Sequence, residues 1–175
     1  MRSITIAIAA SVLMAAAAPG HAAEPSALQV PQSIRLQHRQ IIDRLATLAA
    51  GKGPAAAPAQ KALVFLKDHY AKEEAYVLPP LGLLPRLAKG DISKDMEPAI
   101  ALADRAKAAS ADLQNDHIRI TALMNELVEA GRKTADDELV RFATRVANQS
   151  LSDMEVAHPA AILIGDYLRL RLKNP

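Results

Sequence analysis

Residues 59–78 read AQKALVFLKDHYAKEEAYVL, and this stretch decides how the chain folds. Its apolar residues recur three and four positions apart, which is the spacing of one face of an α-helix. That face runs through Ala62, Leu66, His69, Glu73 and Val77. His69 and Glu73 interrupt it one helical turn apart. The stretch therefore predicts an amphipathic helix that carries an imidazole and a carboxylate towards a core.

The rest of the chain has a similar helical character. Alanine and leucine dominate, aromatic residues make up 3%, and runs of β-branched residues are few, a composition that favours helices over strands. Glycine and proline clusters separate four periodic segments. The predicted helices cover residues 33–50, 59–78, 94–130 and 135–171. We therefore expect an all-α fold, an up-down-up-down antiparallel four-helix bundle.

Two segments are expected to depart from simple helices and loops. Residues 81–91 are too apolar for a solvated loop, so they are expected to form a short helix or a cap packed on the end of the bundle. Pro159 lies inside the fourth segment, where a proline kinks a helix because it lacks the N–H and its ring crowds the preceding turn.

The first 22 residues have the pattern of a secretory signal peptide. Arg2 precedes an apolar run over residues 4–18, and Gly20 and Ala22 supply the small residues of a cleavage site. The run is shorter than the roughly 20 residues that cross a bilayer, which favours cleavage over a retained membrane anchor. We expect a signal peptide at residues 1–22, an extension at 23–32 and one domain at 33–172, exported to the periplasm or secreted, without stable insertion in a membrane.

Charge and cysteine content narrow the classes of function. The formal net charge is +2, and loss of Arg2 with the signal peptide lowers it by one. This balance gives no electrostatic reason to expect a nucleic acid partner. The chain has no cysteine, which excludes disulfides, thiolate metal sites and c-type haem attachment. A bound metal ion would therefore need nitrogen and oxygen ligands.

Every predicted helix places polar side chains on its apolar face. His38 lies on this face in the first helix and His117 in the third, while Gln149 and Asp153 form a pair one turn apart in the fourth. The same spacing continues the inner face of the fourth helix through Val156, Ala160 and Leu163. Two adjacent antiparallel helices place residues at the same height in the bundle when those residues lie equally far along each helix from the loop that joins the two helices. By this measure His38 matches His69, and His117 matches Gln149, to within roughly 3 Å.

The second and third helices fail this test, since His69 and His117 lie at very different distances from the connection between them. The third helix therefore either overhangs the bundle or is broken in the alanine-rich residues 101–109. Level histidines and carboxylates inside a bundle must pair with one another or bind a cation, because buried polar groups without partners cost several kcal/mol. We favour a bound metal ion, since imidazole and carboxylate are common metal ligands and bundles often house such sites.

These motifs resemble the hemerythrin-like, or HHE cation-binding, domain family. The resemblance spans residues 33–168 and rests on segments 34–38, 65–74 with Pro79 behind it, 116–118 and 159–165. In that family, inward histidines and carboxylates hold a non-haem di-iron centre that binds oxygen or related small ligands. The resemblance implies that the metal ligands are His38, His69, Glu73, His117 and Asp153.

The fourth helix departs from the family pattern. Counting back from Pro159, as the second-helix motif counts back from Pro79, puts Gln149 where the family has histidine and Asp153 where it has a carboxylate. Glutamine replaces imidazole poorly, so one or two iron ions are expected. Three further polar residues lie off the apolar faces and are expected to be solvated: Glu74, Glu155 and His158. Glu74 or His158 is expected at most to contact a metal ligand from behind, without binding the metal itself.

The sequence therefore predicts an exported metal-binding protein that carries one or two non-haem iron ions. Its expected role is to bind or sense oxygen, nitric oxide or iron, and it is not expected to be an enzyme. The alternative is a metal-free bundle of the same descent that acts as an interaction or stress-associated protein of the cell envelope. A di-iron oxidase or peroxidase-like enzyme is disfavoured because the candidate ligands do not pair as Glu-x-x-His, the pattern of ferritin-like oxidases.

Overall fold

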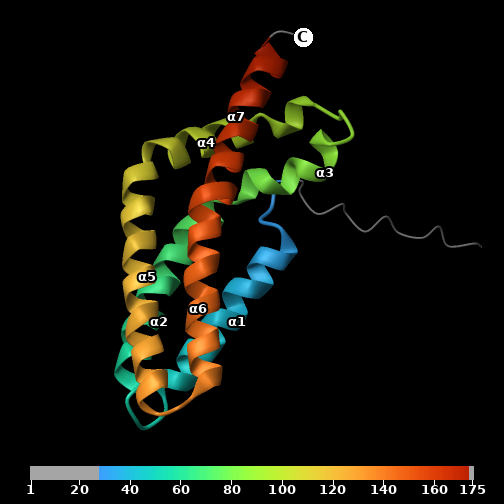
Figure 1. The fold of residues 1–175 in the computed structure, drawn as a ribbon. Helices are drawn as coiled ribbons and strands as arrows, with labels where there is room; N and C mark the ends of the chain where they lie inside the picture. The colour runs from blue at the N-terminus through green and yellow to red at the C-terminus, as the bar shows by residue number, and fades with distance from the viewer. Residues whose placement is uncertain (1–27, 174–175) are drawn as a thin grey trace, which may run out of the picture.

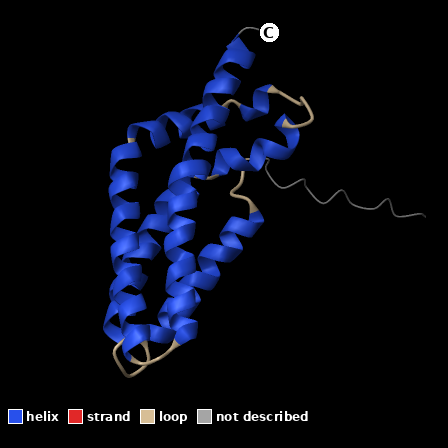
Figure 2. Ribbon diagram, viewed as in Figure 1, coloured by secondary structure: helices blue, strands red, loops and turns tan. Residues whose placement is uncertain are grey.

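The computed structural model describes residues 28–173, and regular structure in this range is entirely helical (Figures 1 and 2). This confirms the all-α fold class. The predicted signal peptide, residues 1–22, lies outside the described residues. Among the helices of residues 28–173, none combines the length and the apolar character that a membrane crossing requires.

Four helices lie side by side and share one apolar core (Figure 1). They are α1 (Gln32–Ala49), α2 (Ala56–Lys72), α5 (Ser110–Lys133) and α6 (Asp137–Ser152). The loops that join α1 to α2 and α5 to α6 lie at the same end, the lower end in Figure 1. The side chains that are almost completely buried in this core include Leu45, Leu66, Leu123, Met124, Leu127 and Leu139.

A second apolar core lies at the opposite end of the molecule. The helices there are α3 (Leu84–Leu87), α4 (Pro98–Ala108) and α7 (His158–Lys173), with the short 3-10 helices η2 (Pro79–Leu83) and η3 (Lys94–Met96). Its buried side chains include Leu78, Leu83, Met96, Leu113 and Leu168. Residues 81–91 therefore form short helical structure against the end of the molecule, as their apolar character predicted.

The third predicted helix is broken at Ala109. Its first part is α4 and its second part is α5, and α4 turns away from α5 (Figure 1). The hydroxyl of Ser110 donates to the backbone carbonyl oxygens of Ala106, at 3.1 Å, and Lys107, at 2.8 Å, which satisfies carbonyls left free where α4 ends. Of the two arrangements that the sequence left open, the broken helix is therefore correct, and His117 lies near the start of α5.

The fourth predicted helix starts two residues later than expected, because the side chain of Asp136 caps it. An Asp136 carboxylate oxygen accepts the backbone N–H of Leu139 at 2.9 Å, so Asp136 is the N-cap and α6 begins at Asp137. The preceding Ala135 has a φ of 53°, in the left-handed region, and makes the tight turn out of α5.

Two π turns interrupt the long helices. They are η1 (Glu73–Val77), which follows α2, and η4 (Asp153–Ala157), which joins α6 to α7. In η1 the backbone N–H of Leu78 donates to Glu73 O at 2.8 Å, and in η4 that of His158 donates to Asp153 O. Each turn ends just before a proline, Pro79 or Pro159. A proline ring clashes with the carbonyl four residues earlier in a regular α-helix, and a widened turn relieves that clash.

The extra residue in η4 changes which face of α7 is buried. The regular helical spacing predicted Val156, Ala160 and Leu163 on the inner face. Val156 and Leu163 are instead 63% and 66% exposed. The residues that pack inward are Ala161, Ile164 and Leu168. That part of the prediction is wrong because a π turn holds one more residue than an α turn, which rotates everything beyond it. The disturbance expected at Pro159 takes the form of this π turn.

Candidate metal centre

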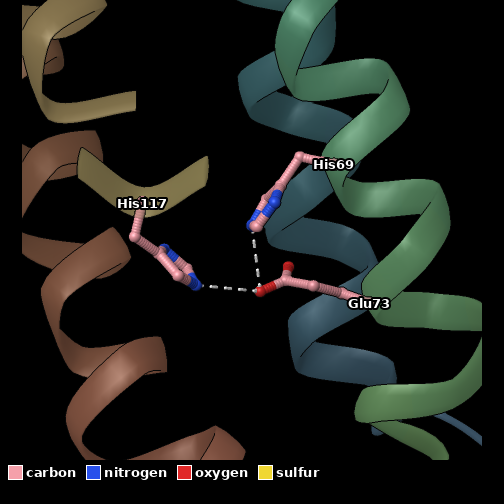
Figure 3. Close-up of side chains that lie close together, drawn as sticks. All are labelled: His69, Glu73 and His117. Carbon is pink, nitrogen blue, oxygen red and sulfur yellow. Dashed lines mark ion pairs between the residues drawn. The ribbon is translucent and has the colours of Figure 1, made fainter. Parts of the chain in front are cut away.

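Four histidines surround the carboxylate of Glu73 between the two apolar cores. His69 and Glu73 come from α2 and η1, His38 from α1, His117 from α5 and His158 from the first position of α7. All five are buried, with Glu73 at 0% exposure and His158, the most exposed, at 8%. Figure 3 shows His69 and Glu73 reaching from one helix towards His117 on another.

The four imidazoles approach Glu73 through the same ring nitrogen. Glu73 Oε1 lies 2.7 Å from His158 Nε2, 3.2 Å from His69 Nε2 and 3.7 Å from His117 Nε2. The other carboxylate oxygen, Oε2, lies 3.6 Å from His38 Nε2. The two oxygens of one carboxylate therefore face different groups of imidazoles.

Three of these histidines are held from behind through Nδ1. The partners are Glu74 Oε1 for His38 at 2.8 Å, Asp116 Oδ2 for His69 at 3.2 Å and Ser150 Oγ for His117 at 2.8 Å. A carboxylate only accepts hydrogen bonds, so Nδ1 of His38 and of His69 carries the hydrogen. The Nε2 of the neutral ring then presents a lone pair to the interior. This is the arrangement by which proteins orient metal-ligating histidines.

Three buried polar atoms at the centre of the cluster make no hydrogen bond with any group of residues 28–173. They are His69 Nε2, His117 Nε2 and Glu73 Oε2. One ligand atom from each of these three residues lies within 4.8 Å of the others. A buried polar atom that makes no hydrogen bond costs about 1–3 kcal/mol. The two unpartnered imidazole nitrogens face Glu73 Oε1, and the unpartnered Oε2 belongs to the same carboxylate. A cation shared by nitrogen and oxygen donors would satisfy them together, so the residues present fit a metal ion such as iron.

The electrostatics of the cluster also suit a cation. Burial would raise the pKa of Glu73, but the hydrogen bond with His158 and the charges of His69 and His158 outweigh it and lower the pKa to about 2, so the carboxylate is ionised. Burial and the neighbouring His69 lower the pKa of His117 to about 4, which leaves that ring neutral near pH 7. Burial lowers the pKa of His69, but Glu73 and Asp116 outweigh it and the net pKa is raised. An ionised carboxylate therefore lies beside a neutral imidazole.

Asp153 and Gln149 lie beside this cluster and are hydrogen-bonded to each other. Gln149 Nε2 donates to Asp153 Oδ1 at 2.8 Å, and Gln149 Oε1 accepts from Gln37 Nε2 at 2.9 Å. Asp153 is 5% exposed. Burial, and then the negative charge of Glu73, raise its pKa to about 6. Of the five predicted ligands, the structure therefore brings His69, Glu73 and His117 closest together, with His38 across Glu73 and Asp153 adjacent.

The prediction for His158 is wrong, because this residue is buried in the cluster and is not solvated. The π turn η4 rotates it inward, and helical periodicity alone gives no sign of that turn. Glu155 is exposed as expected, so the one Glu-x-x-His sequence of this segment, Glu155 to His158, does not place both side chains in the site. Glu74 is partly exposed and supports His38.

Asp116 and Ser150 were also missed as supports of the site. Each directly adjoins a residue on an inner face, His117 or Gln149, and each serves a histidine of a neighbouring helix. Adjacent residues on a helix point in directions about 100° apart, so this position flanks the inner face. A polar residue next to a candidate ligand is the signal that would have found them.

Comparisons with protein-family models, with curated proteins and with solved structures give no match. The chemistry of the buried cluster therefore carries the functional inference. A set of imidazoles oriented through Nδ1 around an ionised carboxylate is suited to bind a divalent cation.

Proposed function

We propose that this protein is a hemerythrin-like metal-binding protein that holds non-haem iron, one or two ions, between its helices. The observation that carries the proposal is the set of unpartnered buried atoms His69 Nε2, His117 Nε2 and Glu73 Oε2. Polar atoms in a folded interior nearly always have partners, so three unpartnered atoms at one carboxylate and two imidazoles beside it call for a ligand. Imidazole nitrogen and carboxylate oxygen are suitable ligands for iron.

Each ligand has a distinct part in this proposal. His69 and His117 face Glu73 Oε1, whereas His38 faces Oε2, so Glu73 is suited to bridge two ions. Asp153 is the additional carboxylate, held beside the cluster by Gln149. Bound iron would supply a coordination position for a small diatomic ligand such as oxygen or nitric oxide. We infer a role in binding or sensing such a ligand, or iron itself, and not in catalysis.

The proposal includes a finer architecture and a location. We propose an up-down-up-down antiparallel four-helix bundle of the hemerythrin type, formed by α1, α2 with η1, α5, and α6 with η4. The apolar core shared by α1, α2, α5 and α6 supports it. We also propose export to the periplasm or secretion, for which the support is the signal-like sequence of residues 1–22.

The first prediction is that His69→Ala abolishes metal binding. The purified protein without residues 1–22 is loaded anaerobically with Fe²⁺, desalted and analysed for iron per chain, and its absorption spectrum is recorded. We expect the wild type to retain one or two ions. His69→Ala removes an imidazole that faces Glu73 and that Asp116 orients, so we expect its iron content to fall close to zero.

Val64→Ala is the matched control. It also truncates a side chain of α2 to alanine, but Val64 is 62% exposed, and we expect its iron content to equal that of the wild type. Iron retained in full by His69→Ala would refute the assignment of the ligands. A folded wild type that retains no iron would instead favour the metal-free bundle, in which the histidines and Glu73 form a buried network of hydrogen bonds and ion pairs.

A further inference from the structure

His158 occupies the interior of the polar cluster. Its Nε2 is 2.7 Å from Glu73 Oε1, nearer than the Nε2 of either His69 or His117. The centre of its ring lies 4.9 Å from that of His117. The His158 ring therefore joins the imidazoles of His69 and His117 at one carboxylate oxygen.

The spacing of these donor atoms suits a single coordination shell. Ligands bound at about 2.1 Å to one ion lie roughly 3.0–3.4 Å from each other in octahedral or tetrahedral geometry. The three imidazole nitrogens lie 2.7, 3.2 and 3.7 Å from Glu73 Oε1, which brackets that range. Adjustments of a few tenths of an ångström would therefore bring Glu73 to ligand spacing with each of them.

The backbone of η4 is what places His158 in this position. In a continuous α-helix, a residue five positions after Asp153 would point about 140° away from it. The π turn instead closes with the hydrogen bond from the N–H of His158 to the carbonyl of Asp153. Both side chains are consequently buried on the inner side of the molecule. π turns of this kind occur frequently at functional sites.

We propose that His158 is a metal ligand and supplies the imidazole that the fourth helical segment lacks at Gln149. The inference rests on the proposed metal-binding function and deepens it. The ion is a divalent first-row transition metal, held by His69, His117 and His158 with Glu73. Each of the four long helical segments then places an imidazole at Glu73, since His38 of α1 faces the second carboxylate oxygen.

A competing role for His158 is to position Glu73 by donating a hydrogen bond to it. His158→Gln separates the two roles, because a glutamine amide still donates to a carboxylate but replaces imidazole poorly as a ligand. A positioning residue would leave the nature of the ligands unchanged. Two quantities are therefore measured: the affinity for the metal ion, and the visible absorption of bound Co²⁺, which depends directly on the set of ligands.

The experiment compares wild type, His158→Gln, His158→Ala and the control Gln114→Ala. Gln114 is exposed and lines the same cavity as His158, without a ligand role in the proposal. Each protein is titrated with Fe²⁺ anaerobically against a competing chelator, and separately with Co²⁺. We expect both His158 variants to bind at least roughly tenfold more weakly than wild type and to show a changed Co²⁺ spectrum, with Gln114→Ala unchanged.

The cavity beside His158 permits a chemical rescue. It has a volume of about 240 Å³ and is lined in part by Ser110, Leu113 and Gln114. Free imidazole has access to the space vacated in His158→Ala. We expect added imidazole to restore most of the metal affinity of His158→Ala and its wild-type Co²⁺ spectrum, but to do neither for His69→Ala, whose ring does not border this cavity.

The outcomes distinguish the two proposals. Weakened binding with an altered Co²⁺ spectrum and rescue by imidazole would support His158 as a ligand. Wild-type affinity in His158→Gln, or weakened binding with an unchanged Co²⁺ spectrum, would overturn it and leave the metal site of His69, Glu73 and His117 standing. A wild type that binds neither Fe²⁺ nor Co²⁺ would overturn the proposed function and this inference together.

Discussion

At the scale of single residues, the buried cluster contains a carboxylate, that of Asp153, whose ionisation destabilises the metal-free fold. Glu73 is ionised and has imidazole partners, whereas the one hydrogen-bond partner of the Asp153 carboxylate within residues 28–173 is the amide of Gln149. Burial and the charge of Glu73 raise the pKa of Asp153 to about 6, so ionising it costs the folded protein free energy. Ionisable groups with strongly shifted pKa values that are buried beside other such groups are typical of functional sites.

We predict that Asp153→Asn stabilises the metal-free protein at neutral pH. Asp153 titrates near 3.8 in the unfolded chain and near 6 in the fold, so the wild type loses stability as pH rises between those values. Asparagine has no such loss and keeps a polar contact for Gln149. The gain in unfolding free energy should be near zero below pH 4 and level off above pH 6, at roughly 3 kcal/mol.

Urea unfolding of both metal-free proteins at several pH values measures this difference. A gain that stays constant from pH 4 to pH 7 would show that the carboxylate of Asp153 is not destabilised by burial. The same substitution should weaken iron binding if Asp153 is a ligand, so its effects on the metal-free and the loaded protein should have opposite signs.

At the scale of elements, the spacing of apolar residues along the sequence predicted the helices and several of their inward residues. The apolar repeat of residues 59–78 predicted α2 and η1 with the inward His69 and Glu73. The mismatch between His69 and His117 indicated that the third helix either overhangs the bundle or is broken, and the structure has the break, at Ala109. The π turns could not be read from periodicity, because they add a residue without changing the sequence pattern. The available signal was the matching position of Pro79 and Pro159, each six residues after an inward carboxylate. Missing η4 meant missing His158.

The contact between α4 and α7 supports a prediction at the same scale. Gly165 of α7 packs so closely against α4 that an added Cβ would overlap the Cβ of Ala103. We predict that Gly165→Ala destabilises the protein by about 1–3 kcal/mol despite the higher helix propensity of alanine, because the two helices must move apart. Thermal or urea unfolding of the metal-free protein measures this effect.

Ala103→Gly is the compensating change, since it removes the atom that Gly165→Ala would meet. Alone it should cost about 1 kcal/mol, the usual effect of glycine within a helix. The double variant should be more stable than the sum of the two single effects predicts. Strict additivity in this cycle would show that α4 and α7 do not meet as closely as the structure indicates.

At the scale of the whole molecule, the polar cluster separates the two apolar cores. Along α2 and η1 the chain passes from Leu66 in the first core, through His69 and Glu73, to Val77 in the second. Helix α5 runs in the opposite direction, from Leu113 in the second core, through His117, to Ile120 in the first. A metal ion bound there would tie the helices together at the level where neither core holds them.

The last prediction is that metal loading raises the stability of both ends of the molecule together. A ligand present at 100 times its dissociation constant stabilises the folded state by about 2.7 kcal/mol. For a domain of this size that corresponds to an increase in Tm of roughly 5–10 °C. We expect one cooperative transition that shifts as a whole on addition of Fe²⁺ under anaerobic conditions. Val64→Ala should shift equally and His69→Ala should not shift. Because the ion would join helices that continue into both cores, a second transition left unmoved by Fe²⁺ would show that the site stabilises one core alone, and equal Tm values with and without Fe²⁺ would contradict the metal centre.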